Sequence, residues 1–210
     1  ERVRVDILDG IGSTEMLHIF ISAAPGDVRY GTTGKPVPGY EARIVDEHGE
    51  DAPQGKVGDL LIAGPSGAGE YWNNRAKSLA TFEGRWTRTG DKYSRDEDGY
   101  YVYAGRSDDM LKVGGIYVSP FEVEGALIGH PAVLEAAVVG HKDENGLVKP
   151  KAVVVPQAGT VGDDALAEAL KDHVKASLAP FKYPRWIEFA EALPKTATGK
   201  IQRFKLRADG

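Results

Sequence analysis

AGRSDDMLKVGG, residues Ala104–Gly115, separates two parts of the chain that differ in sequence character. Before it, β-branched and aromatic residues are interrupted by glycine-containing turns, whereas after it apolar strand patterns alternate with helical patterns. Short polar segments bounded by glycine are typical of domain boundaries and hinges. A surface hairpin is the alternative that this stretch leaves open by itself. We therefore expect a β-rich first part, a smaller second part and a hinge between them.

The composition excludes several classes of function. The chain of 210 residues has a net charge of −5, and an acidic chain is not attracted as a whole to nucleic acid or to anionic lipid. Because it contains no cysteine, it has no disulfide, thiolate metal site or cysteine nucleophile. It shows no apolar run of membrane-spanning length and no signal peptide, so we expect no membrane partner and a cytoplasmic location.

The first residues alternate in polarity and predict a strand over Arg2–Leu8, and its abrupt start predicts that the chain is the later part of a longer protein. IGSTEM, residues Ile11–Met16, follows this strand. Open α/β sheets bind ligands at the carboxyl ends of their strands. Thr14 could therefore donate to a phosphate oxygen and Glu15 could bind Mg²⁺ through oxygen. A plain turn before a helix N-cap would have the same residue types.

Small strands with frequent turns predict a compact barrel or sandwich in the first part. Its expected elements are strands over Glu41–Asp46, Val57–Ala63 and Gly99–Arg106 and a short helix near Asn74–Phe82. RWTRTGD, residues Arg85–Asp91, is expected to end a strand in a tight turn. The carboxylate of Asp91 has two acceptor oxygens and could bind both hydroxyls of a ribose, although aspartate is common in turns.

The part after the hinge has the pattern of a small α+β domain of roughly a hundred residues. Ser119-Pro120-Phe121-Glu122 has the residues of a capping box, and the helix that it starts is expected to run to about Gly129. A second, amphipathic helix is expected over Asp163–Leu178. Apolar strands are expected over Val133–Val139, Lys151–Val155 and Trp186–Phe189.

The tail PKTATGKIQRFKLR, residues Pro194–Arg207, concentrates basic charge in an acidic chain. Thr196, Thr198 and Gly199 predict a turn with Lys200 at its tip, and a lysine there is a point charge suited to a phosphate. A solvated basic terminus or a nucleic-acid-binding arm is the alternative. Nucleic-acid binding needs a broader basic surface with interleaved aromatic residues, so we expect no nucleic-acid partner.

A series of motifs, in this order, resembles the adenylate-forming enzymes, which include acyl-CoA synthetases, peptide-synthetase adenylation domains and firefly luciferase. The motifs are GSTE from Gly12, GDLLIAG from Gly58 with Tyr71-Trp72, TRTGD from Thr87, GRSDDMLK from Gly105 and PKTATGK from Pro194. The resemblance implies a mixed α/β fold. Residues 1–107 would be the β-rich distal part of a large N-terminal domain whose upstream part is missing, and residues 108–210 a small mobile α+β lid domain.

The resemblance also implies a reaction in two steps. A carboxylate attacks the α-phosphate of ATP to give an acyl-adenylate and pyrophosphate, and the thiol of CoA then gives the thioester and AMP. In the first step Lys200 would stabilise the charge on the phosphoryl oxygens. Thr14, with Ser13 beside it, would contact the phosphate, and Glu15 would bind Mg²⁺. Three residues would hold the nucleoside: Asp91 at the ribose, Arg106 beside it and Tyr103 packed against the nucleoside.

For the second step, the resemblance implies that the small domain swings about Asp108. Lys200 would then leave the site, and Gly114 and Gly115 would line a tunnel for the pantetheine arm, because glycine has no side chain to block a close approach. Lys200 with Pro194 before it also resembles the site at which bacterial acyl-CoA synthetases are acetylated. This implies a protein lysine acetyltransferase as a partner.

STEMLHIF from Ser13 and GRSDDMLKVGGIYVSPFEVE from Gly105 are most similar to the benzoate and related aryl-acid CoA ligases. In these enzymes residues matching Gly12, His18 and Ile19 line the acid pocket, so the expected acid is benzoate or a substituted benzoate. Two other functions stay open, a medium-chain fatty acyl-CoA synthetase and a non-catalytic nucleotide-binding module. A His18 that is only a buried packing residue would say nothing about the acid.

Overall fold

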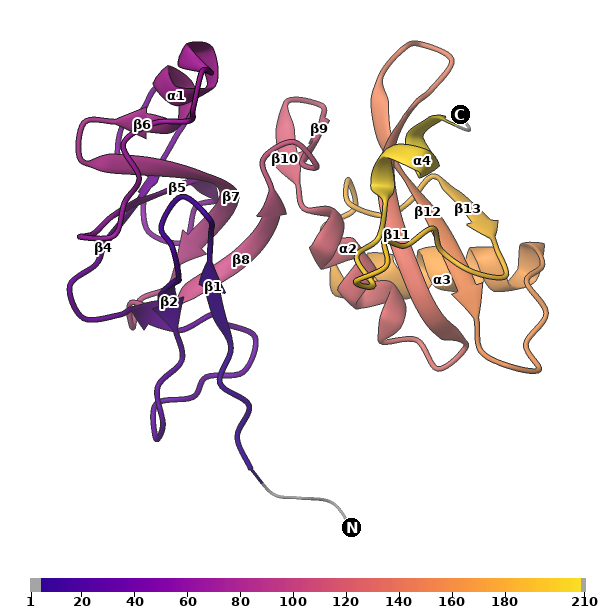
Figure 1. Ribbon diagram of the computed structural model, residues 1–210. Helices are drawn as coiled ribbons and strands as arrows, with labels where there is room; N and C mark the ends of the chain where they lie inside the picture. The colour runs from indigo at the N-terminus through magenta and orange to yellow at the C-terminus, as the bar shows by residue number, and fades with distance from the viewer. Residues whose placement is uncertain (1–4, 209–210) are drawn as a thin grey trace. The chain divides into compact units, whose positions relative to one another are not determined.

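The computed structural model of the chain describes residues 5–208 and divides into two compact units, Glu1–Asp108 and Asp109–Gly210 (Figure 1). The division falls inside the stretch AGRSDDMLKVGG. Each unit has its own buried core. The mixed α/β fold class predicted from the sequence is confirmed. None of the helices in residues 5–208 is long and apolar enough to span a membrane.

The first unit contains two antiparallel sheets. The smaller sheet has the order β1-β2-β3 and consists of β1 (Gly10–Gly12), β2 (Ile19–Ser22) and β3 (Lys35–Pro36). The larger sheet has the order β4-β5-β7-β6, with β8 also paired to β7. Its strands are β4 (Glu41–Val45), β5 (Gly58–Ala63), β6 (Phe82–Glu83), β7 (Trp86–Arg95) and β8 (Tyr101–Arg106).

Side chains from both sheets of the first unit form one core, as the predicted sandwich or barrel requires. The smaller sheet and the loop after β1 contribute Met16, Phe20 and Ile21, and the larger sheet contributes Ile44, Leu60, Ile62, Tyr93 and Tyr101. The helix α1 (Arg75–Thr81) begins at Asn74, whose side chain accepts a hydrogen bond from the backbone of Lys77. This confirms the helix predicted near Asn74–Phe82.

The strand predicted over Arg2–Leu8 is wrong in the part that the structure describes. Residues 5–9 have no regular secondary structure, and residues 2–4 lie outside the described range. The side chains of Val5 and Ile7 are exposed by 69% and 76%. Within residues 5–208 no strand pairs with this stretch, so the alternating apolar residues have no surface on which to be buried.

The tight turn predicted at the end of Arg85–Asp91 is also wrong, because β7 continues to Arg95. Arg88 of β7 is paired with Leu61 of β5, and the next pair is Lys92 with Asp59. Between these two pairs β7 has three residues and β5 has one. Thr89, Gly90 and Asp91 are therefore a bulge inside the strand. Gly90 has a φ of +76°, a conformation that glycine adopts without strain. A bulge bends a strand without ending it, which is why the glycine does not mark a turn here.

The second unit is built on a three-stranded sheet of order β11-β12-β13, formed by β11 (Val133–Lys142), β12 (Val148–Pro156) and β13 (Trp186–Phe189). The first pair is antiparallel and the second is parallel. Two helices accompany the sheet, α2 (Pro120–Ile128) and α3 (Asp164–Ser177). The predicted strands and helices of this part are confirmed, with β11 and β12 longer than expected.

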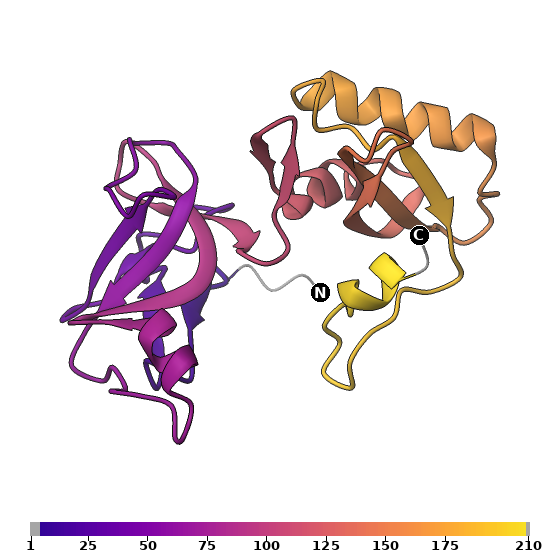
Figure 2. The same ribbon diagram turned by 90° about the horizontal axis from the view of Figure 1, so that it is seen from above.

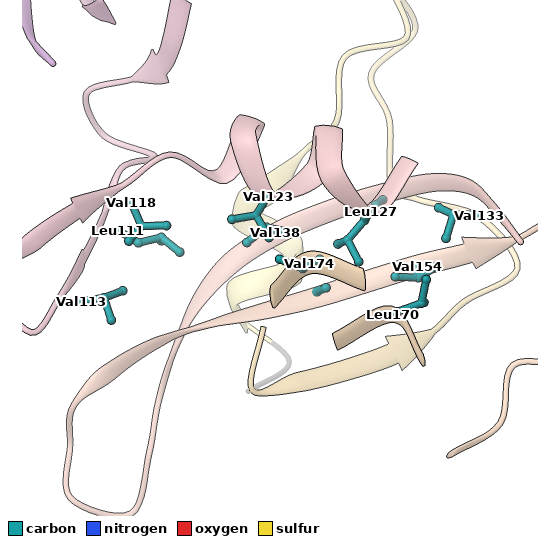
Figure 3. Packing of buried hydrophobic residues seen from close by; sticks show 12 residues of the cluster. Leu111, Val113, Val118, Val123, Leu127, Val133, Val138, Val154, Leu170 and Val174 are labelled. Atoms are coloured by element: carbon teal, nitrogen blue, oxygen red, sulfur yellow. The ribbon is translucent and has the colours of Figure 1, made fainter. Parts of the chain in front are cut away.

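The two faces of this sheet carry different partners, as Figure 2 shows with α3 on one side and the C-terminal segment on the other. Val138 and Val154 share a core with residues of α2 and α3, among them Val123, Leu127, Leu170 and Val174 (Figure 3). Their neighbours on the strands, such as Ala137 and Val153, pack instead against Leu193, Ile201 and Leu206. Successive residues of a strand point to opposite faces, so the tail that includes α4 (Arg203–Ala208) covers the second face.

A short hairpin precedes α2. Its strands are β9 (Leu111–Val113) and β10 (Ile116–Val118), joined by Gly114 and Gly115, which have φ values of +57° and +86°. The buried side chains of the hairpin join the core of the second unit (Figure 3). Ser119 caps α2 by accepting from the backbone of Glu122, as predicted.

Candidate functional site

The loop between β1 and β2 carries most of the residues predicted at the acid and phosphate. Gly12 is paired with Ile19 at an irregular position of the register. A Cβ on Gly12 would lie 2.7 Å from the carbonyl oxygen of His18, so only glycine fits this close approach. Met16 is fully buried and anchors the loop, whereas Thr14 is exposed and Ser13 is partly buried. The buried Met16 therefore fixes the loop on which the hydroxyl residues Ser13 and Thr14 are accessible to solvent.

Glu15 is held by a residue from a distant part of the first unit. The hydroxyl of Tyr71 donates to Glu15 Oε1 at 2.5 Å, and the backbone N–H of Ala68 donates to the Glu15 carbonyl at 2.8 Å. Lys77 lies 4.0 Å from the centre of the Tyr71 ring. The hydrogen bond from Tyr71 is the main cause that holds the pKa of Glu15 below its ordinary value, against the opposing effect of burial. The ionised form of the Glu15 carboxylate is thus favoured.

His18 and Ile19 point their side chains toward solvent in the described chain, and Ile19 is 49% exposed. The reading of His18 as a buried packing residue is therefore wrong. Its ring is nevertheless fixed, because Nε2 lies 3.0 Å from the hydroxyl of Tyr40 and Nδ1 lies 2.7 Å from the carbonyl of Ile19. The Tyr40 hydroxyl also lies 2.6 Å from Ser66 Oγ, and Ser66 donates to the Met16 carbonyl.

A second cluster forms where the bulge of β7 meets the end of β8. Asp91 is 6% exposed and stands opposite Arg106 in the sheet register. Arg106 Nη1 lies 3.1 Å from Asp91 Oδ1 and 3.2 Å from the Thr89 carbonyl. A Cβ on Gly90 would come within 2.8 Å of Arg106 Nη2, so the glycine makes room for the guanidinium. The bulge thus holds a carboxylate and a cation side by side.

Burial and charge act in opposite directions on Asp91. Burial raises the pKa of its carboxyl above the ordinary value, and the neighbouring Arg106 lowers it in part. The arginine therefore favours the ionised form of Asp91 in a poorly solvated position. Tyr103, also on β8, is partly buried, and its ring centre lies 5.3 Å from that of Tyr93. Tyr103 thus borders the core beneath this cluster.

The residue predicted as the hinge lies between two anchored neighbours. Ser107 Oγ donates to Asp59 Oδ1 at 2.9 Å and its backbone N–H donates to Gly90, both in the first unit. Asp109 belongs to the second unit and forms ion pairs with Arg203 and Arg207. The side chain of Asp108 is 80% exposed, and Arg106 Nε lies 3.8 Å from its Oδ1.

Lys200 is exposed on a tight turn of the second unit. The backbone N–H of Thr196 donates to the Lys200 carbonyl, the N–H of Gly199 donates to Thr196, and the N–H of Lys200 donates to Thr196 Oγ1 at 3.1 Å. Gly199 has a φ of +83°. The predicted turn is present, but Lys200 does not lie at its tip: residues 197–199 form the tip, and Lys200 stands opposite Thr196 where the turn closes. Gly114 and Gly115 lie elsewhere in this unit, and a Cβ on either would meet no atom of the described residues within 4 Å.

The structure therefore brings together the residues predicted for the acid pocket around the β1–β2 loop, and Asp91 with Arg106 at the β7 bulge. Lys200 and the glycine pair belong to the second unit. Sequence reasoning missed the hydroxyl of Tyr71 as the partner of Glu15, Tyr40 as the partner of His18, and the ion pair of Arg203 with buried Glu124.

Magnesium has one candidate ligand among the residues predicted for it. Within residues 5–208 no three His, Asp or Glu side chains gather closely enough to enclose a metal ion. Mg²⁺ is commonly held by one or two carboxylates with water and substrate phosphates supplying the other ligands. An ionised, partly exposed Glu15 fits that mode of binding.

Comparison with known proteins gives two family matches. The model of the AMP-binding enzyme family matches residues 1–72, and the model of the AMP-binding enzyme C-terminal domain matches residues 122–200. Benzoate–CoA ligase of Thauera aromatica is 67% identical over 208 residues, which are 99% of this chain and 40% of that protein. The chain thus spans about two fifths of the length of this curated relative.

Solved structures agree with the sequence comparison. A benzoate CoA ligase from Burkholderia xenovorans LB400 superposes with a TM-score of 0.89 at 64% identity, covering 96% of this chain and 40% of the other. The anthranilate CoA ligase AuaEII, solved in complex with anthranoyl-AMP, superposes with a TM-score of 0.91 at 56% identity, covering 98% of this chain and 40% of the other.

Proposed function

The chain belongs to the AMP-binding enzyme family, and from this we propose that it is the C-terminal part of an AMP-forming CoA ligase that activates benzoate or a substituted benzoate. The observation that carries the proposal is the 67% identity to a benzoate–CoA ligase over 99% of the chain. The candidate site supports it, because the described residues offer a carboxylate for a cation, a buried carboxylate with a guanidinium, and an exposed lysine on a turn.

In the first step, a carboxylate oxygen of the acid forms a bond to the α-phosphorus of ATP while the bond to the bridging oxygen breaks and pyrophosphate leaves. Negative charge on the α-phosphoryl oxygens is stabilised by positioned donors and cations. We assign this task to Lys200, with Thr14 and Ser13 contacting the phosphate. The exposed position of Lys200 and the fixed loop around Met16 support these roles.

The nucleoside is assigned to the cluster on β7 and β8. Asp91 accepts from the ribose hydroxyls, and this role requires the ionised carboxylate that the neighbouring Arg106 favours. Tyr103 packs against the nucleoside. Glu15 would hold Mg²⁺, which would neutralise charge on the phosphates of ATP. The hydrogen bond from Tyr71 lowers the pKa of Glu15 and orients its carboxylate for this contact.

In the second step, the thiol of CoA loses its proton to water and its sulfur attacks the acyl carbon of the adenylate, the thioester forms, and AMP leaves with the bonding electrons of the acyl–oxygen bond. We assign the hinge to Asp108, because Ser107 is fastened to the first unit and Asp109 to the second. Gly114 and Gly115, which carry no side chain at the tip of a hairpin, are assigned to the pantetheine path.

Acetylation of Lys200 by a protein lysine acetyltransferase is the regulatory part of the proposal. The lysine is exposed on its turn, and acetylation removes its positive charge. Acetylated enzyme should therefore lose the first step and keep the second. An acetylated Lys200, verified by mass spectrometry, that leaves the first step unchanged would contradict both the switch and the assigned role of the lysine.

The function is tested with the complete enzyme, ATP, CoA and a panel of acids. Benzoate should support release of AMP and pyrophosphate and formation of benzoyl-CoA. A strong preference for octanoate over benzoate would favour a medium-chain acyl-CoA synthetase and reject the aryl substrate. Binding of ATP without AMP release for any acid would favour a non-catalytic nucleotide-binding module.

A further inference from the structure

The segment that carries Lys200 is fastened to its unit by an ion-pair network centred on Arg203. Arg203 Nη2 lies 2.9 and 2.8 Å from the two carboxylate oxygens of Glu124, and Nε lies 3.2 Å from Oε1. On the other side of the guanidinium, Nη1 lies 3.6 Å from Asp109 Oδ2. Only 15% of the Arg203 side chain and 7% of the Glu124 side chain are exposed. One guanidinium therefore joins two carboxylates in a largely buried position.

Glu124 is placed where an unpaired charge would be costly. It lies on α2 and accepts a hydrogen bond from the backbone N–H of Val138 at 2.8 Å. Val138 belongs to β11, an edge strand of the three-stranded sheet. A buried carboxylate is tolerated only when a cation and hydrogen-bond donors surround it. Arg203 supplies that cation, so α2, β11 and the C-terminal segment are joined at one point.

The other partner of Arg203 is the first residue of the second unit. Asp109 directly follows the exposed Asp108, and it also forms an ion pair with Arg207. Arg203 therefore connects the end of the hinge to the segment that carries Lys200, three residues earlier in the chain.

The Lys200 turn has a second anchor on its other side. Lys195 Nζ lies 2.6 Å from Glu135 Oε1 on β11, and Lys195 pairs with Ile201 across the turn. Ile201 packs against the buried cluster on the second face of the sheet. The five residues from Thr196 to Lys200, all of them exposed, therefore lie between an anchor at Lys195 and an anchor at Arg203.

We propose that Arg203 is a positioning residue for the first step of the reaction, because it fixes the Lys200 turn to the hinge-side residue Asp109 and to α2. The inference rests on the proposed function, in which Lys200 acts only in the first step. Because Arg203 holds the turn to the second unit, a rotation at Asp108 moves Lys200 together with that unit. The planar fork of arginine suits this task, since it binds two carboxylates at fixed angles, whereas lysine is a point charge.

The decisive variant is Arg203→Lys in the complete enzyme, because it keeps the positive charge beside Glu124 and removes the fork. A misplacement of about 1 Å can lower a rate by on the order of a hundredfold. Benzoate-dependent ATP–pyrophosphate exchange should therefore fall by roughly tenfold to a hundredfold. Formation of benzoyl-CoA from supplied benzoyl-adenylate should stay within about twofold of the unmodified enzyme. Equal losses in both steps, or no loss in the first, would overturn the proposal.

Two further variants distinguish a loss of positioning from a general loss of folding. In the double variant Glu124→Gln/Arg203→Gln both charges are removed together, so no buried charge stays unpaired, and the same selective loss of the first step is expected. Lys182→Gln is the matched control, because Lys182 Nζ contacts both carboxylate oxygens of Glu122 on the same helix at 2.6 Å, away from the Lys200 segment. The control should leave the ratio of the two steps unchanged, and a selective loss there would refute a special role of Arg203.

Hydrogen exchange of the backbone amides of Thr196, Gly199 and Lys200 gives a readout that does not depend on activity. In Arg203→Lys these amides should exchange about tenfold faster than in the unmodified enzyme, while Lys182→Gln leaves them unchanged. If the enzyme makes no adenylate from any acid, the proposed function fails, yet the exchange rates still decide whether Arg203 holds the turn. Unchanged exchange in Arg203→Lys would reject the inference.

Discussion

The hydroxyl of Tyr71 donates a 2.5 Å hydrogen bond to Oε1 of Glu15, a residue 56 positions earlier in the chain. Tyr71 stands just before α1, and Glu15 stands in the loop after β1. The bond therefore joins a loop of the smaller sheet to the segment that follows β5 of the larger sheet. Its effect is electrostatic as well as geometric, because a hydrogen bond to the charged form of an acid favours that form. Tyr71 thereby favours the ionised form of Glu15, which the proposed contact with a cation requires.

Tyr71→Phe tests this relationship, since it keeps the ring and removes only the hydroxyl. The pKa of Glu15 should rise toward its ordinary value, because the bond from Tyr71 is the main cause of its lowering. The variant should also lose about 1 kcal/mol of unfolding free energy at neutral pH, the usual net value of a hydrogen bond. A lowered pKa stabilises the fold above the unfolded pKa, so this loss should disappear as the pH falls through the folded pKa.

An NMR titration of the Glu15 carboxyl, with unfolding followed at several pH values, measures both effects. Trp72→Phe is the matched control, because Trp72 is adjacent in sequence and 94% exposed. The control should leave the Glu15 titration unaltered. An unshifted pKa in Tyr71→Phe would show that the hydroxyl does not govern the carboxylate.

Arg106→Gln tests the electrostatics of the β7 bulge. Removal of the guanidinium leaves buried Asp91 without its cation, so the pKa of Asp91 should rise further above its ordinary value. At neutral pH the variant should lose about 1–3 kcal/mol of unfolding free energy, the cost of an unsatisfied buried group. This loss should shrink as the pH falls through the raised pKa, because a protonated Asp91 no longer needs a counter-ion.

Denaturant unfolding between neutral and acidic pH measures the trend. Arg85→Gln serves as control, because Arg85 and its partner Glu41 are 62% and 59% exposed, and exposed ion pairs contribute about 0–1 kcal/mol. The control should show a small loss without this acid-side recovery. A pH-independent loss in Arg106→Gln would mean that the arginine acts by packing and not by charge.

The elements that the sequence predicted correctly are those specified by local patterns. Ser119 and Asp163 cap their helices through bonds to residues three positions later, and Val138 and Val154 alternate with the neighbouring residues that face the other side of the sheet. Caps and alternation depend on near neighbours, so a sequence shows them directly. The turn at Lys200 is of the same kind, because its bonds connect Thr196 with Gly199 and Lys200.

The failures have non-local causes. The sequence around Gly90 predicts a turn. Only the pairing of β7 with β5 and β8 shows that Gly90 lies in a bulge inside a continuing strand. The strand predicted near Val5 needs a partner strand, and the described residues supply none. The partners of Glu15 and Glu124 lie 56 and 79 positions away in the chain. No local pattern could have indicated them.

Lys200→Ala separates the two chemical steps. In the complete enzyme, adenylation should fall by on the order of a hundredfold or more, if the lost cation resembles a lost oxyanion donor. Thioester formation from supplied acyl-adenylate should be retained, because the lysine is assigned no role in it. Pyrophosphate exchange and single-turnover thioester formation measure the two rates. Equal losses in both would indicate that Lys200 is only structural.

Asp108→Pro tests the hinge. Proline fixes φ near −65° and restricts the residue before it, while Asp108 has an exposed side chain whose removal costs little packing. Adenylation should persist and thioester formation should be lost, because the swing between the two steps is blocked. Asp108→Ala is the control that removes the side chain but leaves φ free, and both steps should continue in it. Full turnover by the proline variant would exclude Asp108 as the hinge.

Substitution of His18 tests the selection of the acid. The His18 ring is held by the hydroxyl of Tyr40, which belongs to the same unit. An aromatic acid needs a flat, mostly apolar slot with few polar groups. Gly12 lets the backbone approach closely, Ile19 offers an apolar wall, and His18 offers a flat edge with one polar atom.

His18→Ala should therefore raise the benzoate KM or relax selection toward larger acids, while the KM for ATP stays unchanged. Tyr40→Phe keeps every ring and removes the hydroxyl with its 3.0 Å contact to His18 Nε2 and its 2.6 Å contact to Ser66 Oγ, so it should change the benzoate KM in the same direction and by less. A benzoate KM that is unaltered in both variants, measured by pyrophosphate exchange in the complete enzyme, would remove His18 from the acid pocket and leave the assignments of Lys200 and Asp91 intact.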